Sequence, residues 1–328
     1  MNAIVTGGAG FIGAHLVERL LGDGHRVVVL DNLSTGRVEN LNNIAQKSNL
    51  SFFDVDISNF DSISGYFKGI DWVFHLAALA DIVPSIVEPQ RYHRSNVDGT
   101  IAVLEAARQN KVKKLVYAAS SSCYGIAEVC PTPETAQISP QYPYALTKYI
   151  GELYALHWAK VYKLPVISLR LFNVYGPKAR TCGTYGAVLG VFLAQKLNGA
   201  PFTVVGDGSQ KRDFVYVLDV AQAFIQAAMS NIEDGIFNVG SGNPQSINKL
   251  VSLLGGEKTH IPKRPGEPDC TWADINKIKE MLGWQPRTSF EEGISLVLED
   301  IDYWKGAVVW TPEKVEEATR DWFKYLAR

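Results

Sequence analysis

The first half of the chain alternates between short apolar runs and amphipathic segments. Runs rich in valine, isoleucine and leucine predict strands at 3–7, 26–32, 50–57, 71–78, 114–120 and 165–176. Between them, apolar residues at helical spacing predict helices at 11–24, 59–68, 91–110 and 142–162. Nearly continuous apolar strands separated by helices are typical of a parallel sheet covered on both faces. The pattern therefore predicts a doubly wound α/β fold, in which ligands bind at the carboxyl ends of the strands.

The second half of the chain is less regular. Glycine and proline become frequent after residue 176, and loops join the predicted helices at 186–198, 219–230, 246–254, 275–282 and 290–304. The final segment, 311–328, predicts an amphipathic helix with Thr311 as its N-cap and Pro312 in its first turn. We therefore expect a first domain at 1–175 and a smaller C-terminal α/β lobe at 176–328 that closes over the ligand site.

Composition and charge narrow the class of protein. The chain has 328 residues, of which 46% are hydrophobic and 20% charged, as in ordinary soluble globular proteins. A net charge of −2 gives no reason to expect nucleic acid or an anionic membrane as a partner. The cysteines at positions 123, 130, 182 and 270 match neither a zinc pattern nor a dense disulfide framework, so we expect free thiols and no metal.

Targeting and membrane-spanning patterns indicate where a protein acts. The N-terminus lacks the pattern of a signal peptide, and apolar runs stay shorter than the ~18 residues of a membrane span. These observations predict a soluble cytoplasmic protein.

The glycine-rich loop "TGGAGFIG" (6–13) joins the first predicted strand to the first predicted helix. Gly7, Gly10 and Gly13 are spaced by two residues, and Gly8 gives the loop a G-x-G-x-x-G pattern as well. A loop of this kind lets backbone amides and the helix N-terminus approach a pyrophosphate closely. Because it lies between a strand and a helix, it indicates a dinucleotide site.

The end of the second strand indicates which dinucleotide is bound. Asp31 lies where a carboxylate can accept hydrogen bonds from both hydroxyls of the adenosine ribose, and it would repel a 2′-phosphate. The sequence thus predicts NAD, although the nearby Arg37 keeps NADP open as an alternative. A turn formed by the Asp-Asn pair is the other interpretation of Asp31.

Two further strand ends face the same crevice. Asp56 follows the third strand, where it can either meet the adenine amine or cap a helix. "HLAA" (75–78) ends the fourth strand with small residues, so Ala77 and Ala78 would let a dinucleotide lie against the backbone. His75 lies in an apolar run, and we expect a hydrogen-bonded core histidine there rather than a catalytic group.

The candidate chemistry lies in "AASSSCYG" (118–125) and "YPYALTK" (142–148). Ser120 ends the fifth strand, whereas Tyr144 and Lys148 are one helical turn apart. A phenol titrates near 10, so it can act as a base near pH 7 only beside a cation. We expect Lys148 to stabilise the tyrosinate and bind the nicotinamide ribose, Tyr144 to move a proton, and Ser120 to hold the substrate hydroxyl. The alternatives are hydroxyl caps in a turn and an ordinary surface helix.

Motifs along nearly the whole chain resemble a known family. They are "TGGAGFIG", "DNLSTGR", "HLAA", "NVDGT", "SSSCYG", "YALTK", "RLFNVYGP", "GDGSQKRDFVYVLDV", "FNVGSG" and "RPGEPDCTWAD". Together they resemble the nucleotide-sugar epimerase/dehydratase branch of the extended short-chain dehydrogenases/reductases. The resemblance implies a Rossmann-type NAD-binding domain at 1–175 and a nucleotide-sugar-binding lobe at 176–328.

The resemblance also implies binding residues. NAD contacts are implied at Gly7, Gly10, Phe11, Ile12, Gly13, Asp31, Asn32, Ser34, Thr35, Gly36, Asp56, Ile57, Leu76, Ala77, Ala78, Asn96, Ala118, Tyr144 and Lys148. Nucleotide-sugar contacts are implied at Ser85, Ser120, Ser121, Ser122, Asn173, Arg212 and Arg264. The two arginines are implied to bind the diphosphate, for which a planar guanidinium is well shaped. Surface solvation or ion pairing between the lobes is the alternative for them.

Two departures from family patterns concern the reaction and the substrate. Sugar dehydratases of this family carry an Asp-Glu pair after the catalytic hydroxyl residue, whereas Ser121 and Ser122 occupy those positions here. The serine run is similar to that of the 4-epimerases. The loop 78–89 places Asp81 and Pro84 where a small polar and a basic residue are common, while Ser85 matches. An inward-facing Asp81 would disfavour a uronic acid.

The resemblance therefore implies NAD-dependent, reversible C4 epimerisation of a UDP-hexose through a 4-keto intermediate. The substrate pair would be UDP-glucose/UDP-galactose or the N-acetyl pair. A nucleotide-4-ketosugar reductase and a non-catalytic NAD-binding sensor are the alternatives.

The predicted helices at 91–110 and 142–162 indicate a homodimer. The second carries apolar residues beyond one core-facing stripe, at Tyr149, Leu153, Leu156 and Trp158. Related enzymes pair these two helices into a four-helix interface. The alternative is that these side chains pack on their own sheet.

Overall fold

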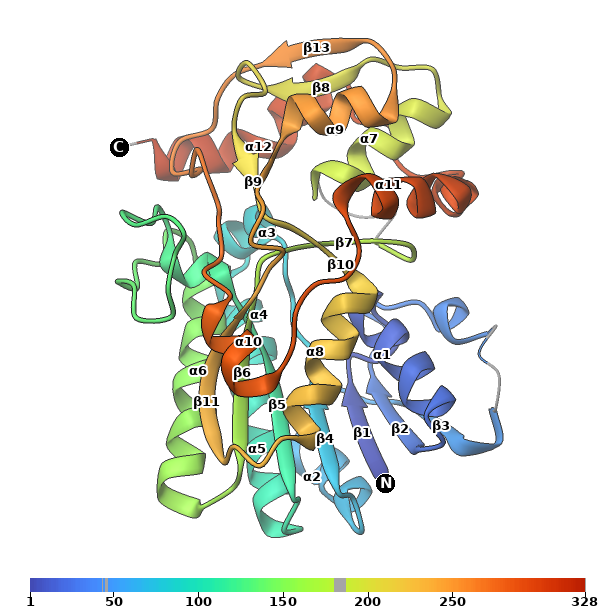
Figure 1. The fold of residues 1–328 in the computed structure, drawn as a ribbon, viewed down its shortest axis with the longest axis vertical. Helices are drawn as coiled ribbons and strands as arrows, with labels where there is room; N and C mark the ends of the chain where they lie inside the picture. The colour runs from blue at the N-terminus through green and yellow to red at the C-terminus, as the bar shows by residue number, and fades with distance from the viewer. Residues whose placement is uncertain (43, 45–46, 180–186, 328) are drawn as a thin grey trace.

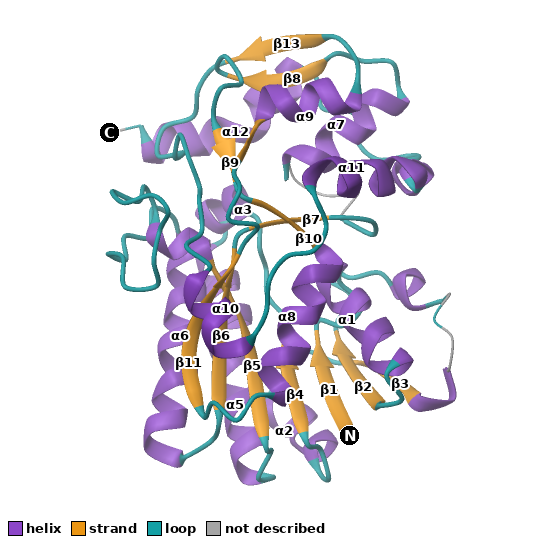
Figure 2. Cartoon of the chain, viewed as in Figure 1, coloured by secondary structure: helices purple, strands orange, loops and turns teal. Residues whose placement is uncertain are grey.

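The computed structural model describes residues 1–42, 44, 47–179 and 187–327. Its centre is a seven-stranded sheet in the order β11-β6-β5-β4-β1-β2-β3, in which neighbouring strands are parallel (Figure 2). The strands are β1 (Asn2–Thr6), β2 (Arg26–Asp31), β3 (Leu50–Asp54), β4 (Trp72–His75), β5 (Lys114–Ser120), β6 (Val166–Leu171) and β11 (Asp234–Val239). The predicted doubly wound α/β fold is confirmed. All seven carboxyl ends lie at one edge, which is where such a sheet binds ligands.

Helices cover both faces of the sheet because alternate strand residues point to opposite sides. One face packs on α1 (Phe11–Gly22), α8 (Val217–Met229) and α10 (Asn276–Leu282). The other packs on α2 (Phe60–Ile63), α5 (Gly99–Gln109) and α6 (Pro143–Tyr162). The predicted helix at 91–110 consists of α4 (Pro89–His93), a π-helical stretch (Arg94–Asp98) and α5. Each face therefore has its own hydrophobic core.

A smaller lobe lies above the carboxyl ends of the strands (Figure 1). It contains α7 (Val188–Leu197), α9 (Ile247–Leu254), α11 (Phe290–Glu299), α12 (Pro312–Leu326) and the parallel pair β8 (Phe202–Val205) and β13 (Lys258–Ile261), around a third core. Two short strand pairs connect it to the sheet: β7 (Asn173–Tyr175) with β10 (Phe214–Tyr216), and β9 (Lys211–Arg212) with β12 (Gln245–Ser246). The short helix α3 (Ile82–Val87) lies beneath α12. The lobe thus faces the ligand edge of the sheet.

After the expected boundary at residues 175 and 176, the chain returns to the sheet. Strand β11 pairs with β6, and α8 and α10 pack on the core next to it. We therefore propose that the segments 1–175, 217–239 and 273–284 form one packed unit. The predicted strand at 165–176 is likewise divided: Phe172 separates β6 from β7, and its amide donates to the Val239 carbonyl at 2.9 Å.

A buried ion pair fixes α6 to the sheet. Arg170 of β6 donates to the Glu152 carboxylate of α6 at 2.6 Å, and both side chains are almost fully buried. Arg170 also donates to the Tyr124 hydroxyl at 2.8 Å, and Tyr124 donates to Asn238 of β11 at 2.7 Å. A buried charge needs such partners. One network therefore holds α6, the segment after β5, and the edge strand together.

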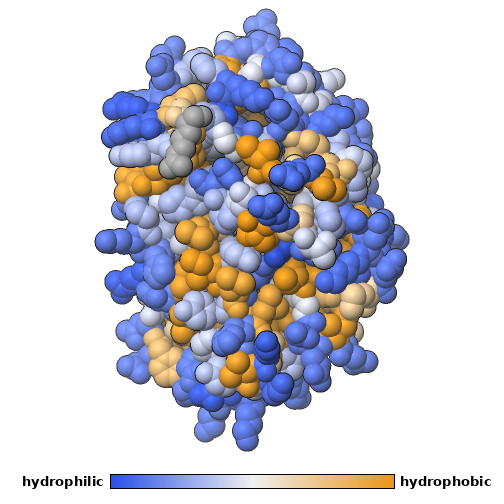
Figure 3. All heavy atoms as spheres, turned by 90° about the vertical axis from the view of Figure 1, so that its left-hand side faces the viewer, coloured by the Kyte–Doolittle hydropathy of each residue, from blue (hydrophilic) through white to orange (hydrophobic). Residues whose placement is uncertain are grey.

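The outer face of α6 carries exposed apolar side chains, and Figure 3 shows apolar residues gathered on the side of the molecule where α6 lies. Those of α6 are Leu146, Leu153, Tyr154, Val161 and Tyr162. No helix in the described parts of the chain is long and apolar enough to cross a membrane.

Candidate active site

A cavity of about 390 Å³ lies at the carboxyl ends of the strands. Most of the predicted cofactor residues line it: Gly7, Gly10, Phe11, Ile12, Gly13, Asp31, Asn32, Ser34, Thr35, Asp56, Ile57, Leu76, Ala77, Ala78 and Ala118. The other predicted cofactor residues, Gly36, Asn96, Tyr144 and Lys148, lie outside this lining. The smaller lobe contributes Leu189, Gly190, Val191, Ala307, Val308 and Trp310, which the sequence analysis did not identify. The sequence around these residues has neither a glycine-rich loop pattern nor a cluster of charges that would indicate a ligand.

The glycine loop is shaped to approach an anion closely. Gly7 has a φ of +71°, and a Cβ there would lie 2.7 Å from the Ala77 amide. A Cβ on Gly13 would overlap the Gly7 carbonyl. Gly10, which has no side chain, occupies the N-cap of α1, so the first amides of that helix point toward the cavity mouth without an intrahelical acceptor. These features fit the pyrophosphate of a dinucleotide.

Asp31 is buried at the end of β2, and its carboxylate shapes the loop that follows. It accepts hydrogen bonds from the Ala9 amide at 3.0 Å and the Leu33 amide at 2.9 Å. Burial raises the pKa of Asp31. The residue thus forms a turn and also lines the cavity, so the two interpretations of its role are compatible. Arg37, whose presence kept NADP open, has its guanidinium 5.5 Å from the centre of the Tyr303 ring.

Asp56 and Asn96 are held by internal hydrogen bonds. Asp56 accepts from the Ser58 amide at 2.9 Å, while Asn59 caps α2. Asn96 lies in the π-helical stretch, where its side chain accepts from the Leu79 amide at 2.8 Å and donates to Thr147 at 3.0 Å. Asn96 therefore joins the loop after β4 to α6, and its contact with a cofactor stays a prediction.

His75 is a core histidine, as predicted. Its ring nitrogens are hydrogen-bonded to Thr6 at 2.7 Å and to Thr100 at 2.9 Å. Complete burial lowers the pKa of His75 to about 3, with a smaller contribution from the Lys148 charge. A neutral ring with two partners has no free atom for proton transfer.

Ser120, Tyr144 and Lys148 come from two neighbouring elements. Ser120 ends β5, and Tyr144 lies in the first turn of α6. The Ser120 hydroxyl lies close enough to that of Tyr144 to act as a hydrogen-bonding partner and lower its pKa. Lys148 follows one turn later and is buried, with Nζ 4.3 Å from the centre of the Tyr117 ring. Ser120 and Tyr144 thus lie close together, and Lys148 is buried against Tyr117, one helical turn after Tyr144.

Burial shifts the pKa values of both Tyr144 and Lys148. Burial raises the pKa of Tyr144; Asp81 adds to this, whereas the hydrogen bond from Ser120 lowers it. Burial also lowers the pKa of Lys148 to about 7, against the opposing effect of Glu152. Taking either group out of water disfavours its charged form. The hydrogen bond with Ser120 favours the tyrosinate, and the expected role of Lys148 stays a prediction.

Arg212 and Arg264 meet at one carboxylate. Arg212 donates to Glu267 at 2.7 Å, and the Arg264 guanidinium lies 3.8 Å from the other oxygen of Glu267. The predicted anion-binding arginines are therefore neighbours in space, although 52 positions separate them in the chain. Glu267 was not predicted, but it lies in "RPGEPD", three residues after Arg264.

Tyr142 connects this arginine pair to the serine run. Ser122, Glu267 and Arg212 all lie close enough to Tyr142 to influence its pKa. Its ring is parallel to that of Tyr144, with centroids 6.4 Å apart. Burial raises the pKa of Tyr142 to about 12, so it is a neutral hydrogen-bonding group. Tyr142 was not predicted, because in the sequence it is Tyr144 that has a lysine one helical turn away.

The remaining predicted substrate residues differ in their placement. The Asn173 side chain accepts from the Thr271 hydroxyl at 2.8 Å, so it faces the smaller lobe. The Ser85 hydroxyl donates to the Ile82 carbonyl of its own helix at 2.5 Å. Ser121 begins the short 3₁₀ helix that follows Ser120.

Asp213 organises the loops around the arginines, a role that the sequence analysis did not identify. It accepts from the Ser241 amide at 2.5 Å and hydroxyl at 2.6 Å, and from the amides of Gly242 at 3.1 Å and Ala273 at 2.9 Å. These bonds join the motifs "KRDFV", "VGSG" and "TWAD". Its position next to Arg212 in the chain was the available signal.

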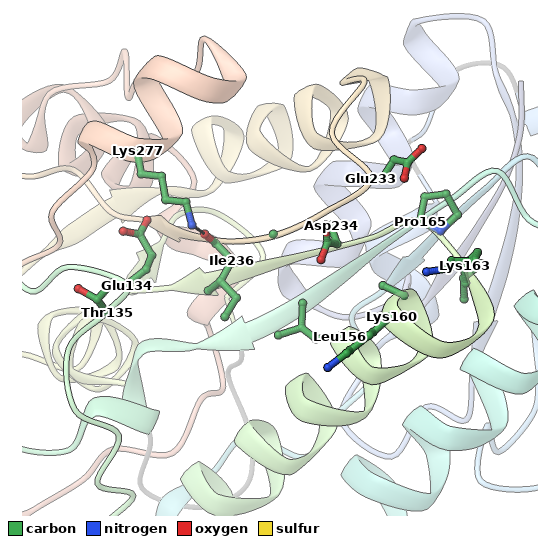
Figure 4. Close-up of a pocket in the computed structure, with 13 residues that line it drawn as sticks. Glu134, Thr135, Leu156, Lys160, Lys163, Pro165, Glu233, Asp234, Ile236 and Lys277 are labelled. Atoms are coloured by element: carbon green, nitrogen blue, oxygen red, sulfur yellow. Dashed lines mark hydrogen bonds between the residues drawn. The ribbon is translucent and has the colours of Figure 1, made fainter.

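A second, larger cavity of about 900 Å³ lies at the β11 edge of the sheet (Figure 4). Lys277 donates to the Ile236 carbonyl at 2.8 Å, and Glu134 accepts from the Asn238 amide at 2.8 Å. These side chains satisfy backbone groups that an edge strand leaves unpaired. Among the described residues, its lining includes none of the predicted site residues. The smaller cavity is therefore the candidate site.

Comparisons with known proteins agree with this geometry. A model of the NAD dependent epimerase/dehydratase family matches residues 3–240. A UDP-glucose 4-epimerase of Mycolicibacterium smegmatis is 38% identical over 308 residues, covering 91% of this chain and 98% of the relative. The structure of UDP-glucose 4-epimerase from Thermotoga maritima with UDP-glucose has a TM-score of 0.86 at 37% identity, covering 93% of this chain and 99% of that chain. UDP-glucuronic acid 4-epimerase from Bacillus cereus, in complex with UDP-glucuronic acid and NAD, has a TM-score of 0.85 at 32% identity, with coverages of 93% and 99%.

The buried lysine predicts a pH-dependent stability difference. Its pKa is about 7 in the folded protein but ~10.4 in an unfolded chain. Between these values the unfolded chain binds a proton that the folded chain lacks, so stability rises with pH. We expect the free energy of unfolding of the wild type, relative to Lys148→Met, to rise by up to ~1.4 kcal/mol per pH unit from pH 7 to pH 10. Urea unfolding measures it.

Lys160→Met, at an exposed position of the same helix, is the matched control for that experiment. A difference between wild type and Lys148→Met that stays constant over this pH range would contradict the lowered pKa of Lys148.

Proposed function

The chain belongs to the NAD-dependent epimerase/dehydratase family, and we propose that it catalyses the reversible C4 epimerisation of a UDP-hexose. The substrate pair is UDP-glucose/UDP-galactose or the corresponding N-acetyl pair. The observation that carries this proposal is the proximity of Ser120 and Tyr144. Ser120 follows Ala118 of the cofactor cavity by two residues, and Tyr144 lies beside Tyr142, which is within range of the charges of Arg212 and Glu267. A proton-transfer group, a cofactor site and an anion site thereby adjoin one another.

NAD fits the smaller cavity because of its shape and chemistry. The glycine loop leaves room for a pyrophosphate, and Asp31 offers a carboxylate to ribose hydroxyls. When bound, NAD would supply a hydride acceptor for C4 of the sugar and, once reduced, a hydride donor for the 4-keto group. The NAD-binding residues are those predicted from the sequence, with Lys148 at the nicotinamide ribose.

The chain's own residues handle the proton and the substrate. Tyr144 takes the proton of the C4 hydroxyl and returns it, while Ser120 hydrogen-bonds to the same oxygen. Arg212 and Arg264 bind the diphosphate, with Asn173 beside them. Because this anchor is separate from the reacting carbon, the 4-keto sugar can turn while the nucleotide stays in place. Ser121 and Ser122 occupy the positions of the acidic pair that the dehydratases use, so the chain lacks the acid that dehydration requires there.

Asp81 favours a neutral sugar. It lines the cavity at the N-terminus of α3, and its charge raises the pKa of Tyr144. A carboxylate close enough to influence the reacting oxygen would repel the carboxylate of a uronic acid. We therefore assign a UDP-hexose, although a relative acting on UDP-glucuronate is 34% identical.

A homodimer formed through α6 is part of the proposal. The exposed apolar side chains of α6 lie at spacings of seven and eight residues, which places them on one face. Leu153 belongs to this face, whereas Tyr149 and Trp158 pack against the cores of their own chain. For Tyr149 and Trp158, packing against their own chain is therefore the supported interpretation.

A cytoplasmic location is supported by the thiols. Cys123, Cys130 and Cys270 are free, as expected of a reducing compartment. Cys182 lies outside the described residues.

The reaction is tested with UDP-glucose deuterated at C4 and no added cofactor. We expect UDP-galactose that carries the deuterium at C4, since the hydrogen leaves and returns within one site. Tyr144→Phe should reduce turnover by about 10²–10⁴-fold, because it removes the oxygen that moves the proton. Tyr149→Phe, on the same helix, is the control, and UDP-N-acetylglucosamine and UDP-glucuronate complete the substrate panel. A stoichiometric need for NADH would instead identify a reductase, and loss of water with solvent deuterium at C5 a dehydratase.

The cofactor is tested by denaturing the purified protein and identifying the released nucleotide. We expect NAD. In Asp31→Ala the ribose hydroxyls lose a charged acceptor, so NAD affinity should fall by about 10- to 100-fold. Asp61→Ala, at an exposed position of α2, serves as the control. Release of mainly NADP would overturn the assignment.

The dimer is tested by light scattering at micromolar concentration. We expect twice the chain mass of 36.2 kDa. Leu153→Glu should give monomers because it introduces a charge into the apolar face, whereas Leu218→Glu, on exposed α8 surface, should not. A wild-type mass equal to one chain would reject the dimer.

A further inference from the structure

The C-terminal helix α12 packs one stripe of its surface inward. Thr311 caps it by accepting from the Lys314 amide, and Pro312 begins it. Its buried residues are Val315, Thr319 and Trp322, at spacings of four and three. Helix α12 contacts α3, the helix that follows Asp81 (Figure 1), and Val315 is part of the core of the smaller lobe. The helix is therefore fixed to the lobe and not a loose tail.

Trp322 reaches from α12 to the loop that carries the arginine. Its indole Nε1–H donates to the Pro265 carbonyl at 2.7 Å, and its ring centre lies 5.6 Å from the Arg264 guanidinium. The side chain is only 5% exposed. Hydrogen bond and cation–π contact together hold both the backbone and the side chain of this segment, which also carries Glu267.

The same indole contacts the catalytic side of the site. Trp322 and Tyr142 have ring centroids 6.2 Å apart, and Tyr142 in turn lies parallel to Tyr144. Trp322 thus lies between Arg264 and Tyr142, two residues that belong to different elements and to opposite ends of the proposed substrate. A side chain in this position sets their distance.

We infer that α12 forms the outer wall of the nucleotide-sugar site and that Trp322 is a positioning residue, which acts on the substrate diphosphate through Arg264. The inference rests on the proposed function. It assigns a binding role to the C-terminal helix, far in sequence from the glycine loop and from Tyr144. Because Trp322 lies on the substrate side, its loss should weaken nucleotide binding and leave NAD retention and the chemical step largely intact.

The test measures UDP binding to the NAD-containing enzyme by calorimetry, together with kcat and KM. Trp322→Ala should weaken UDP binding by about 10-fold, which corresponds to ~1.4 kcal/mol. KM should rise similarly, with kcat and NAD content kept near wild type. Trp322→Phe keeps a ring but loses the donor, so its effect should be smaller. Tyr325→Ala, an exposed aromatic on the same helix, should bind UDP as the wild type does.

A double-mutant cycle with Arg264→Ala separates positioning from general stability. If Trp322 acts through Arg264, Trp322→Phe should cost little further UDP affinity in the Arg264→Ala background. Fully additive losses, or wild-type UDP binding by both Trp322 variants, would overturn the inference while the wild type still epimerises. A wild type that binds neither UDP nor UDP-hexoses would overturn the proposed function itself, and this inference with it.

Discussion

The geometry of the site depends on the buried ion pair between Arg170 and Glu152. Glu152 lies on α6, one turn after Lys148 and two turns after Tyr144, and Arg170 lies on β6 next to the strand that ends in Ser120. The same guanidinium donates to the hydroxyl of Tyr124, just beyond the serine run. A serine on a strand and a tyrosine on a helix can keep a hydrogen bond only if strand and helix stay in register. A buried charge that loses its partner costs about 3–5 kcal/mol. Because a shift of α6 would separate Glu152 from Arg170, α6 has little freedom to move.

Much of the fold could be predicted because local sequence patterns determine it. Apolar runs flanked by helical periodicity reveal parallel strands, and the spacing of Gly7, Gly10 and Gly13 reveals the turn that a pyrophosphate requires. Strand β11 was not predicted, because its place beside β6 is decided by contacts between residues 68 positions apart, Val166 and Asp234. The break at Phe172 has a similar origin: its amide bonds to Val239, a partner that local periodicity does not disclose.

The candidate site was predictable in its members but not in its electrostatics. Motifs named Ser120 and Tyr144, which lie close together, and Arg212 and Arg264, which meet at Glu267; their roles stay predictions. The pKa directions depend on burial, which arises only when the lobe, α6 and the loops after the strands have packed. Glu267 could have been noticed as a carboxylate next to a predicted phosphate ligand, three residues from Arg264. Its negative charge offsets the repulsion between the buried Arg212 and the partly buried Arg264.

Burial of Tyr144 and Lys148 has a consequence for when the phenol can react. Desolvation favours the neutral form of each, and Asp81 adds a negative charge on the same side. Ser120 offsets part of this effect, so the tyrosinate needs further positive charge close by. Oxidised NAD carries a positive charge on its nicotinamide ring, and reduced NAD does not. A cation bound beside Tyr144 would therefore favour the tyrosinate while the C4 hydroxyl loses its proton. Once Tyr144 has taken that proton, the neutral phenol that burial favours is the form that returns it to the 4-keto oxygen. In such a site the protein need not lower the tyrosine pKa permanently, which explains why a buried phenol with a raised pKa is compatible with catalysis.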